Sequence, residues 1–210
     1  MPHILQRIIA IFLIFFFAPL IALICIITWI SIRKFPIFRQ ERVGKNGAKF
    51  IMHKIKTVKA DSKFPIWPTA ESPVRFWFGK FLRRFWLDEI AQLYDIVRGE
   101  MNLVGPRPEM TIFSRYFDVL IEQYHIRRSV YPGITGLAQV NGYRNNTDLD
   151  ERIRLDVEYI RKRSFYLDIK IILLTILEVL TSKNYRSRKR NRIGFAEELT
   201  RKVMEFNNLT

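Results

Sequence analysis

Cysteine is almost absent from this sequence, and acidic residues are few. Cys25 is the only cysteine among 210 residues, which excludes a disulfide framework and a cysteine-based zinc site. Twenty Asp and Glu stand against 35 Lys and Arg, for a formal net charge of +15. Such an excess indicates an acidic partner, and nucleic acid, anionic lipid and a phosphorylated substrate all qualify. The sequence contains no nucleic-acid-binding motif.

Charged residues are also missing between Ile8 and Ile32. A helix of this length reaches about 37 Å, enough to cross a hydrocarbon core of roughly 30 Å. The run is too long for a cleavable signal peptide, and bulky residues stand where a small-x-small cleavage site would lie. We therefore expect residues 1–33 to remain in the membrane, followed by a domain over residues 34–182 and a basic tail over residues 183–210.

Pro19 lies near the middle of the apolar run. It removes one backbone donor and pushes Ala18 away from helical geometry, which predicts a sharp bend. Two topologies fit: a kinked helix that spans the membrane, which the pattern alone favours slightly, and a re-entrant helix-break-helix that dips into one leaflet. Cations flank both ends, with Arg7 before the run and Arg33 and Lys34 after it, which suits two ends near cytoplasmic headgroups.

A carboxylate pair, Asp88 and Glu89, opens a stretch with helical periodicity, for which we predict a helix from about Asp88 to Arg98. Adjacent helical residues point about 100° apart, so the two carboxylates are expected to do different jobs. Such a pair taken alone is more often a dipole and capping device. Downstream, Pro106 and Pro108 restrict the backbone on either side of Arg107, which we interpret as a preset phosphate fork.

Two runs with apolar alternation, residues 37–43 and 49–58, flank Gly44-Lys45-Asn46-Gly47 and predict a β-hairpin. His53 in the second run has no partner visible in the sequence, so an incidental surface histidine is expected. Residues 59–76 are polar with several prolines and predict a loop near the active site. The aromatic and cationic residues from Phe76 to Trp86 suit an interfacial amphipathic helix, with ordinary core packing as the alternative. Further helices are expected over residues 109–127, 149–165 and 169–180, with a short one over 195–206.

The order of these motifs resembles the bacterial sugar transferases, the monotopic phosphoglycosyl transferases, over nearly the whole chain from Arg7 to about Ser182. The matching stretches are Leu87-Asp88-Glu89, Leu103-Val104-Gly105-Pro106-Arg107-Pro108 and the glycine-rich element Pro132–Gly142. We expect the glycines of that element to permit close backbone approach to a ligand. The resemblance favours the re-entrant topology. The expected fold is mainly α with a small β-hairpin, with interfacial helices on a catalytic domain at the cytoplasmic face of the bacterial inner membrane.

The resemblance also implies a reaction. A sugar 1-phosphate would pass from a UDP-sugar to undecaprenyl phosphate, with release of UMP, through a covalent phosphosugar-aspartyl intermediate. Asp88 would be the nucleophile, Glu89 would hold Mg²⁺, and Lys54, Arg107 and Arg144 would contact substrate, with a solvated arginine as the alternative for Arg144. Anionic lipid and downstream glycosyltransferases would be further partners, and nucleic acid would not. The alternative function is a non-enzymatic, membrane-anchored basic scaffold or nucleic-acid binder.

Overall fold

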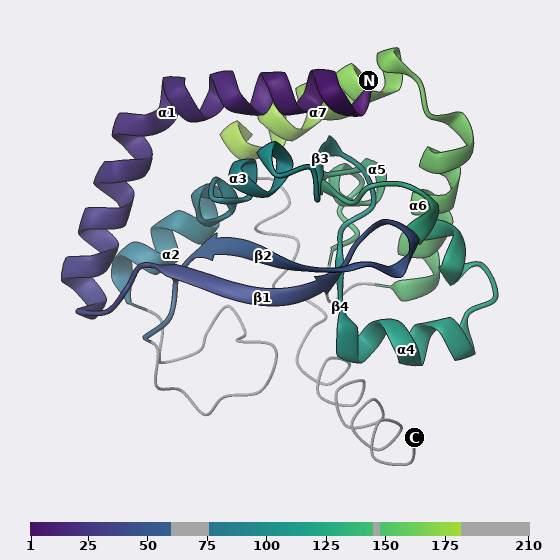
Figure 1. Ribbon diagram of the computed structural model, residues 1–210, viewed down its shortest axis with the longest axis horizontal. Helices are drawn as coiled ribbons and strands as arrows, with labels where there is room; N and C mark the ends of the chain where they lie inside the picture. The colour runs from purple at the N-terminus through teal and green to yellow at the C-terminus, as the bar shows by residue number, and fades with distance from the viewer. Residues whose placement is uncertain (60–75, 145–147, 182–210) are drawn as a thin grey trace.

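The computed structural model describes residues 1–59, 76–144 and 148–181. Figure 1 shows the bent helix α1 (His3–Ile32) running along one edge of a mixed domain of helices and short strands. The predicted loop over residues 60–75 and the basic tail from residue 183 lie outside the described residues. The expectation of a mainly helical chain with a small hairpin is confirmed in outline.

The hairpin forms where its turn chemistry predicts. Strands β1 (Ile37–Val43) and β2 (Lys49–Ile55) pair antiparallel with Gln40 opposite Met52. The turn contains the 3-10 helix η1 (Lys45–Gly47), in which Asn46 and Gly47 take positive φ values of 54° and 79°. Strand β4 (Glu109–Met110) adds to the other edge of β1. The second strand ends at Ile55, three residues earlier than predicted.

A second sheet was not foreseen. Strand β3 (Asn102–Val104) pairs in parallel with β5 (Gly133–Thr135). This pairing joins the glycine-rich element to residues 105–108, which carry Arg107 and are called the arginine loop below. Gly105 N–H also donates to Thr135 O at 2.9 Å. The helices around the sheets are as follows: α2 (Trp77–Arg84), η2 (Leu87–Glu89), α3 (Gln92–Val97), α4 (Thr111–Leu120), η3 (Tyr124–Ser129), α5 (Leu137–Val140), α6 (Leu149–Lys162) and α7 (Phe165–Thr181).

Two predicted helices are interrupted. The helix expected from Asp88 to Arg98 begins instead as η2 and becomes α3 only at Gln92, because the backbone from Trp86 to Tyr94 uses i to i−3 hydrogen bonds. The helix expected over residues 109–127 ends at Leu120, because Ile121 is extended with φ −125° and ψ 107°. The chain then continues as the separate helix η3.

Helix α1 bends near its middle, and both of its arms pack on the rest of the protein (Figure 1). Ala10 of the first arm joins a core with Phe50 and Leu93, and Ile24 of the second arm joins a core with Leu82. Gln6 Oε1 accepts from the N–H groups of two β3 residues, at 2.9 and 3.2 Å. The predicted bend is confirmed, although the helix is assigned without interruption across Pro19. By length and composition α1 is apolar enough to cross a membrane.

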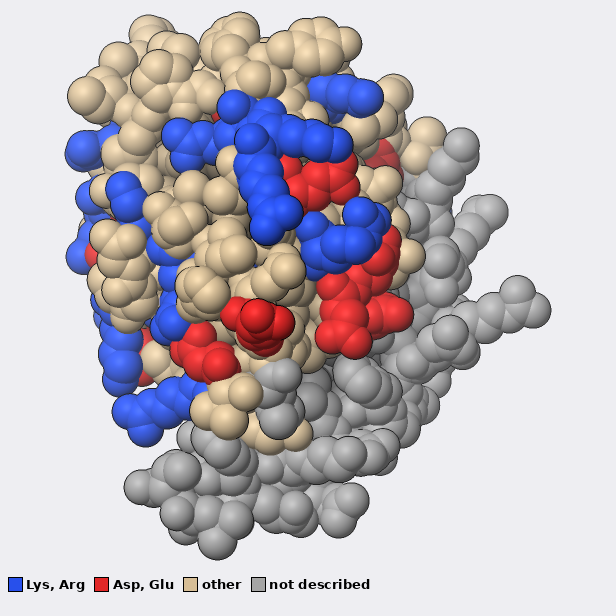
Figure 2. Space-filling view, turned by 90° about the vertical axis from the view of Figure 1, so that its right-hand side faces the viewer, with Lys and Arg blue, Asp and Glu red and all other residues tan. Residues whose placement is uncertain are grey.

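Large apolar side chains remain exposed on the outer faces of α1 and α7. Phe12, Phe15 and Phe16 on α1 and Tyr166 and Leu180 on α7 are each more than two thirds exposed. Figure 2 shows a mostly uncharged surface along the top of the molecule, where Figure 1 places the first arm of α1 and α7, with Lys and Arg gathered beneath it.

Candidate active site

The carboxylate pair lies on η2, directly after Trp86, whose φ of 59° is left-handed. A 3-10 helix has three residues per turn, so adjacent side chains diverge by about 120°. Asp88 and Glu89 therefore enter different surroundings, although both are buried. The turn is tighter than predicted, and the different jobs expected for the two carboxylates stay a prediction.

Glu89 is bound by two cations from separate elements. Arg107 donates from Nη2 to Oε1 at 2.7 Å and from Nη1 to Oε2 at 3.1 Å. Lys54 Nζ, from β2, donates to Oε1 at 2.9 Å. Burial opposes ionisation of Glu89, but the charges of Arg107 and Lys54 outweigh it and hold the pKa of this carboxyl well below its usual range. The structure thus brings Glu89 together with two selected residues that lie 35 and 18 positions away in the sequence.

Asp88 has a different environment. The nearest cation in an ion pair is Arg83, whose Nε lies 4.0 Å from Oδ2. Oδ1 is buried and has no hydrogen-bond partner within the described ranges. Burial raises the pKa of Asp88, and the charge of Lys54 partly offsets this. A buried carboxylate oxygen without a donor costs stability, so this arrangement points to a chemical role for Asp88.

Burial acts to lower the pKa of both Lys54 and Arg107, but the net shifts of the two residues are opposite. Burial lowers the pKa of Lys54 to about 8, against the attraction of Glu89. For Arg107, burial also acts to lower the pKa, but Glu89 outweighs it and raises the pKa above its ordinary value. Both residues therefore carry charge into a buried site at neutral pH, where an anion gains more from them than it would in water.

Arg144 lies at the edge of this site. Its guanidinium carbon is 3.5 Å from the centroid of the Trp86 ring, and Nη2 donates to Glu178 of α7 at 3.1 Å. The residue is 8% exposed, so the alternative of a solvated arginine is wrong. Burial lowers the pKa of Arg144, while the charges of Glu178 and Glu89 raise it. Arg144 thus contacts both Trp86, which precedes η2, and Glu178 on α7.

The carboxylates of Asp88 and Glu89 can be compared with the ligands that Mg²⁺ requires. The described part of the chain contains no cluster of three or more His, Cys, Asp or Glu side chains that could hold a metal ion. Mg²⁺ commonly uses one or two carboxylates together with substrate phosphate oxygens and water. Asp88 Oδ1 has no hydrogen bond among the described residues, and Glu89 beside it supplies a second carboxylate. This donor set fits Mg²⁺ when a substrate pyrophosphate supplies the remaining oxygens.

The glycine-rich element packs differently from our expectation. A Cβ on Gly133 would lie 2.1 Å from Gly105 N, and one on Gly136 would lie 2.3 Å from Gly105 O. The space that these glycines leave is filled by backbone of the arginine loop, because β3 and β5 approach each other closely here. The glycines position the loop, and the interpretation that they leave room for a ligand is wrong for these two.

Two groups of buried polar residues were missed in the sequence. His53 N–H donates to Asp95 Oδ2 at 2.9 Å, and its ring Nδ1 lies 2.6 Å from Oδ1, so His53 is not an incidental surface residue. The second group lies behind the arginine loop: Arg42, Glu109, Arg127, Arg152 and Asp156. Neither group has a short-range signal, since the partners of each ion pair lie 18 to 43 positions apart.

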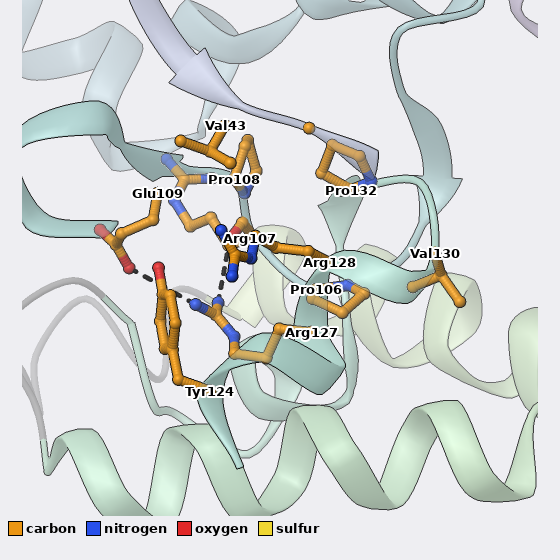
Figure 3. A pocket seen from close by; sticks show the side chains of 11 residues that line it. Val43, Pro106, Arg107, Pro108, Glu109, Tyr124, Arg127, Arg128, Val130 and Pro132 are labelled. Carbon is orange, nitrogen blue, oxygen red and sulfur yellow. Dashed lines mark hydrogen bonds and ion pairs between the residues drawn. The ribbon is translucent and has the colours of Figure 1, made fainter. Parts of the chain in front are cut away.

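A cleft runs beside this second group, lined in part by Arg107, Glu109, Tyr124 and Arg127 (Figure 3). Figure 3 shows the Arg127 side chain between Tyr124 and the backbone of Arg107. The cleft is thus formed in part by the arginine loop, whose Arg107 side chain binds Glu89.

Comparison with known proteins identifies the family of the chain. Residues 1–182 match the family described as bacterial sugar transferase, so the chain belongs to that family and the predicted resemblance is confirmed. It is 41% identical over 153 residues to a UDP-glucose:undecaprenyl-phosphate glucose-1-phosphate transferase of Xanthomonas campestris pv. campestris, covering 70% of this chain and 32% of that protein. A protein of the same name from Caulobacter vibrioides is 36% identical over 176 residues, 80% of this chain and 65% of its own length.

A relative from Aeromonas hydrophila is named for a different sugar. This UDP-N-acetylgalactosamine-undecaprenyl-phosphate N-acetylgalactosaminephosphotransferase is 37% identical over 150 residues, 69% of this chain and 35% of its own length. The chain thus spans between about a third and two thirds of the length of these relatives.

Proposed function

We propose that this chain transfers a sugar 1-phosphate from a UDP-sugar to undecaprenyl phosphate, giving a polyprenyl diphosphate sugar and UMP. The observation that carries the proposal is the buried pair in which Glu89 is bound by Arg107 and Lys54 while Asp88 keeps an oxygen without a donor among the described residues. The names of the relatives support both substrates. Because those names differ in the sugar, the proposal covers UDP-sugars as a class.

Asp88 acts as the nucleophile in this proposal. Its carboxylate oxygen forms a bond to the β-phosphorus of the UDP-sugar as the bond from that phosphorus to the bridging oxygen breaks, and UMP leaves. A phosphate oxygen of the polyprenyl acceptor then attacks the same phosphorus and releases Asp88. The raised pKa of Asp88 supports this role, since a more basic carboxylate is a stronger nucleophile once ionised. Two steps at one carboxylate keep the pyrophosphate and the acceptor phosphate from meeting directly.

Arg107 and Lys54 neutralise phosphate charge. In the structure they bind Glu89, which keeps both cations in place before substrate arrives. The Arg107 fork matches two phosphate oxygens, and a buried setting strengthens each contact. Arg144 would make a further phosphate contact from its place against Trp86. Glu89, with Asp88, would hold Mg²⁺, which when bound supplies charge stabilisation to the pyrophosphate.

The membrane arrangement that we propose is re-entrant. Residues of both arms of α1 are buried against one domain, so a helix crossing the bilayer would pull one arm away from its core. The exposed apolar faces of α1 and α7 supply a surface for lipid, and the cations beneath them suit anionic headgroups at the cytoplasmic face of the inner membrane. The product would then be extended by downstream glycosyltransferases.

UMP release tests the proposal directly. The purified chain in anionic lipid nanodiscs would be given a panel of UDP-sugars with undecaprenyl phosphate and Mg²⁺, and UMP would be quantified. We expect release that depends on the acceptor with at least one sugar, lost in Asp88→Asn and retained in Asp118→Asn, whose partner is the half-buried Arg128. Salt-sensitive polynucleotide binding without turnover of any UDP-sugar would favour the scaffold or nucleic-acid binder instead.

A further inference from the structure

Three successive backbone carbonyls of the arginine loop are each bound by a donor from a different part of the fold. Pro106 O accepts from Gly133 N–H at 2.9 Å. Arg107 O accepts from Arg127 Nη2 at 3.0 Å, and Pro108 O accepts from Arg42 Nη1 at 3.2 Å. The loop lies between strands β3 and β4, so regular secondary structure does not fix it.

The two prolines make these side-chain donors important. Pro106 and Pro108 have no N–H, so the loop has fewer backbone donors of its own with which to form a turn. The prolines restrict their own φ angles and the ψ of Arg107, but other contacts must set the ψ of Pro106 and the φ of Arg107. The guanidinium groups of Arg127 and Arg42 bind the Arg107 and Pro108 carbonyls and supply such contacts. Figure 3 shows Arg127 beside the loop.

Both guanidinium groups are themselves held firmly. Arg127 Nε donates to Asp156 Oδ2 at 2.7 Å, and its Nη1 lies 3.7 Å from Glu109 Oε2. Arg152 binds the same Glu109 oxygen at 2.7 Å. Arg42 donates from Nη2 to Gln40 Oε1 at 2.5 Å. All of these charged groups are at most 6% exposed.

The arginines behind the loop pair with carboxylates other than Asp88 and Glu89. Glu109 and Asp156 supply the carboxylates for Arg127 and Arg152, so Glu89 is left to bind Arg107 and Lys54. The Arg107 side chain is accordingly directed at Glu89 of the carboxylate pair.

We infer that Arg127 and Arg42 are positioning residues that fix the Arg107 peptide and thereby direct its guanidinium at the substrate phosphate. The phosphate part of this inference rests on the proposed function. The anchoring part does not, because it concerns backbone contacts that exist without substrate.

Arg127→Lys tests the anchoring. A lysine keeps the charge but has one donor centre, so it cannot reach Asp156 and Arg107 O together as the guanidinium does. We expect several-fold faster hydrogen exchange at the amides of Arg107 and Glu109, while the rest of the domain stays protected. Arg128→Lys is the matched control, since Arg128 is the next residue on η3 and pairs with Asp118 at 2.6 Å. Unchanged exchange in a folded Arg127→Lys would overturn the anchoring.

A double-mutant cycle tests whether Arg127 acts through Arg107. With UDP-glucose as the first probe, and otherwise with the UDP-sugar turned over fastest, we expect Arg127→Lys to lower kcat/KM about tenfold in the native background. In an Arg107→Lys background the same change should cost less than about threefold, because the fork that it positions is already gone. Equal losses in the two backgrounds would show a general structural effect and refute positioning.

Arg42→Lys provides a second test if Arg127→Lys does not fold. Arg42→Lys should speed hydrogen exchange at the amides of Arg107 and Glu109, because Arg42 on β1 donates a hydrogen bond to Pro108 O. Exchange unchanged there would likewise overturn the inference. Absence of UMP release from the native protein with every UDP-sugar would refute the proposed function, while the exchange measurement would still decide the anchoring.

Discussion

Arg107→Lys is the substitution whose effect follows most directly from the geometry. Arg107 makes two directed contacts with Glu89, at 2.7 and 3.1 Å, and the same fork would meet two oxygens of a phosphate. A lysine keeps the charge and loses one of the two contacts. A hydrogen bond to a charged group contributes about 1.5 to 3 kcal/mol, so kcat/KM should fall roughly 10- to 150-fold.

The assay is the initial rate of UMP release over a range of UDP-sugar concentrations. Arg98→Lys is the control, because Arg98 pairs with Glu100 at 3.0 Å and its side chain is 46% exposed, where one fewer contact costs little. A thermal unfolding measurement on each variant separates lost activity from lost structure. Normal turnover by folded Arg107→Lys would mean that the fork makes no directed phosphate contact, and Arg107 would then serve loop structure alone.

Three further predictions concern topology, packing and acid stability. In a Cys25→Ser background, His3→Cys should react with a membrane-impermeant thiol reagent only from the cytoplasmic side, and labelling from the periplasmic side would show that α1 spans. Gly133→Ala should destabilise the fold by about 1 to 3 kcal/mol or more, seen as a lower unfolding midpoint, because its Cβ would meet backbone atoms at 2.1 and 2.6 Å; an unchanged midpoint would contradict this packing. Burial acts to raise the pKa of Glu109, but the charges of Arg152, Arg127 and Arg42 outweigh burial and hold this pKa below its ordinary value. The ionised carboxylate therefore stabilises the fold at pH values above the ordinary pKa, and this stabilisation is lost as the pH falls through the lowered pKa. Glu109→Gln should therefore be less stable than the native protein at pH 7 and lose that difference in acid; a gap independent of pH would refute this.

Local patterns were sufficient for part of the fold and part of the site. The uncharged run with Pro19 predicted a bent helix, and the Gly-Lys-Asn-Gly turn predicted the hairpin. The order of motifs selected Asp88, Glu89, Lys54 and Arg107, and the structure brings all four together. The bend and the hairpin could be predicted because each depends on neighbouring residues or on turn chemistry, whereas the site residues were selected through the resemblance to bacterial sugar transferases.

The remainder depends on contacts between distant residues. Strands β3 and β5 have three residues each, too short to show a period, and their pairing explains glycines that we had assigned to a ligand. The 3-10 winding of η2 was missed because Ile90 and Leu93 fit a helical spacing equally well. Arg127 and Arg128 are adjacent, and no pattern shows that the first is buried against Asp156 while the second is half-buried.

The mass of the intact protein after exposure to a UDP-sugar without acceptor tests the central claim most directly. If Asp88 is the nucleophile, the native protein should gain the mass of one sugar phosphate, peptide mapping should place it on Asp88, and undecaprenyl phosphate should remove it. Asp88→Asn should remain folded in the membrane and show neither the adduct nor turnover. Full turnover by Asp88→Asn, or an adduct on another residue, would contradict the account.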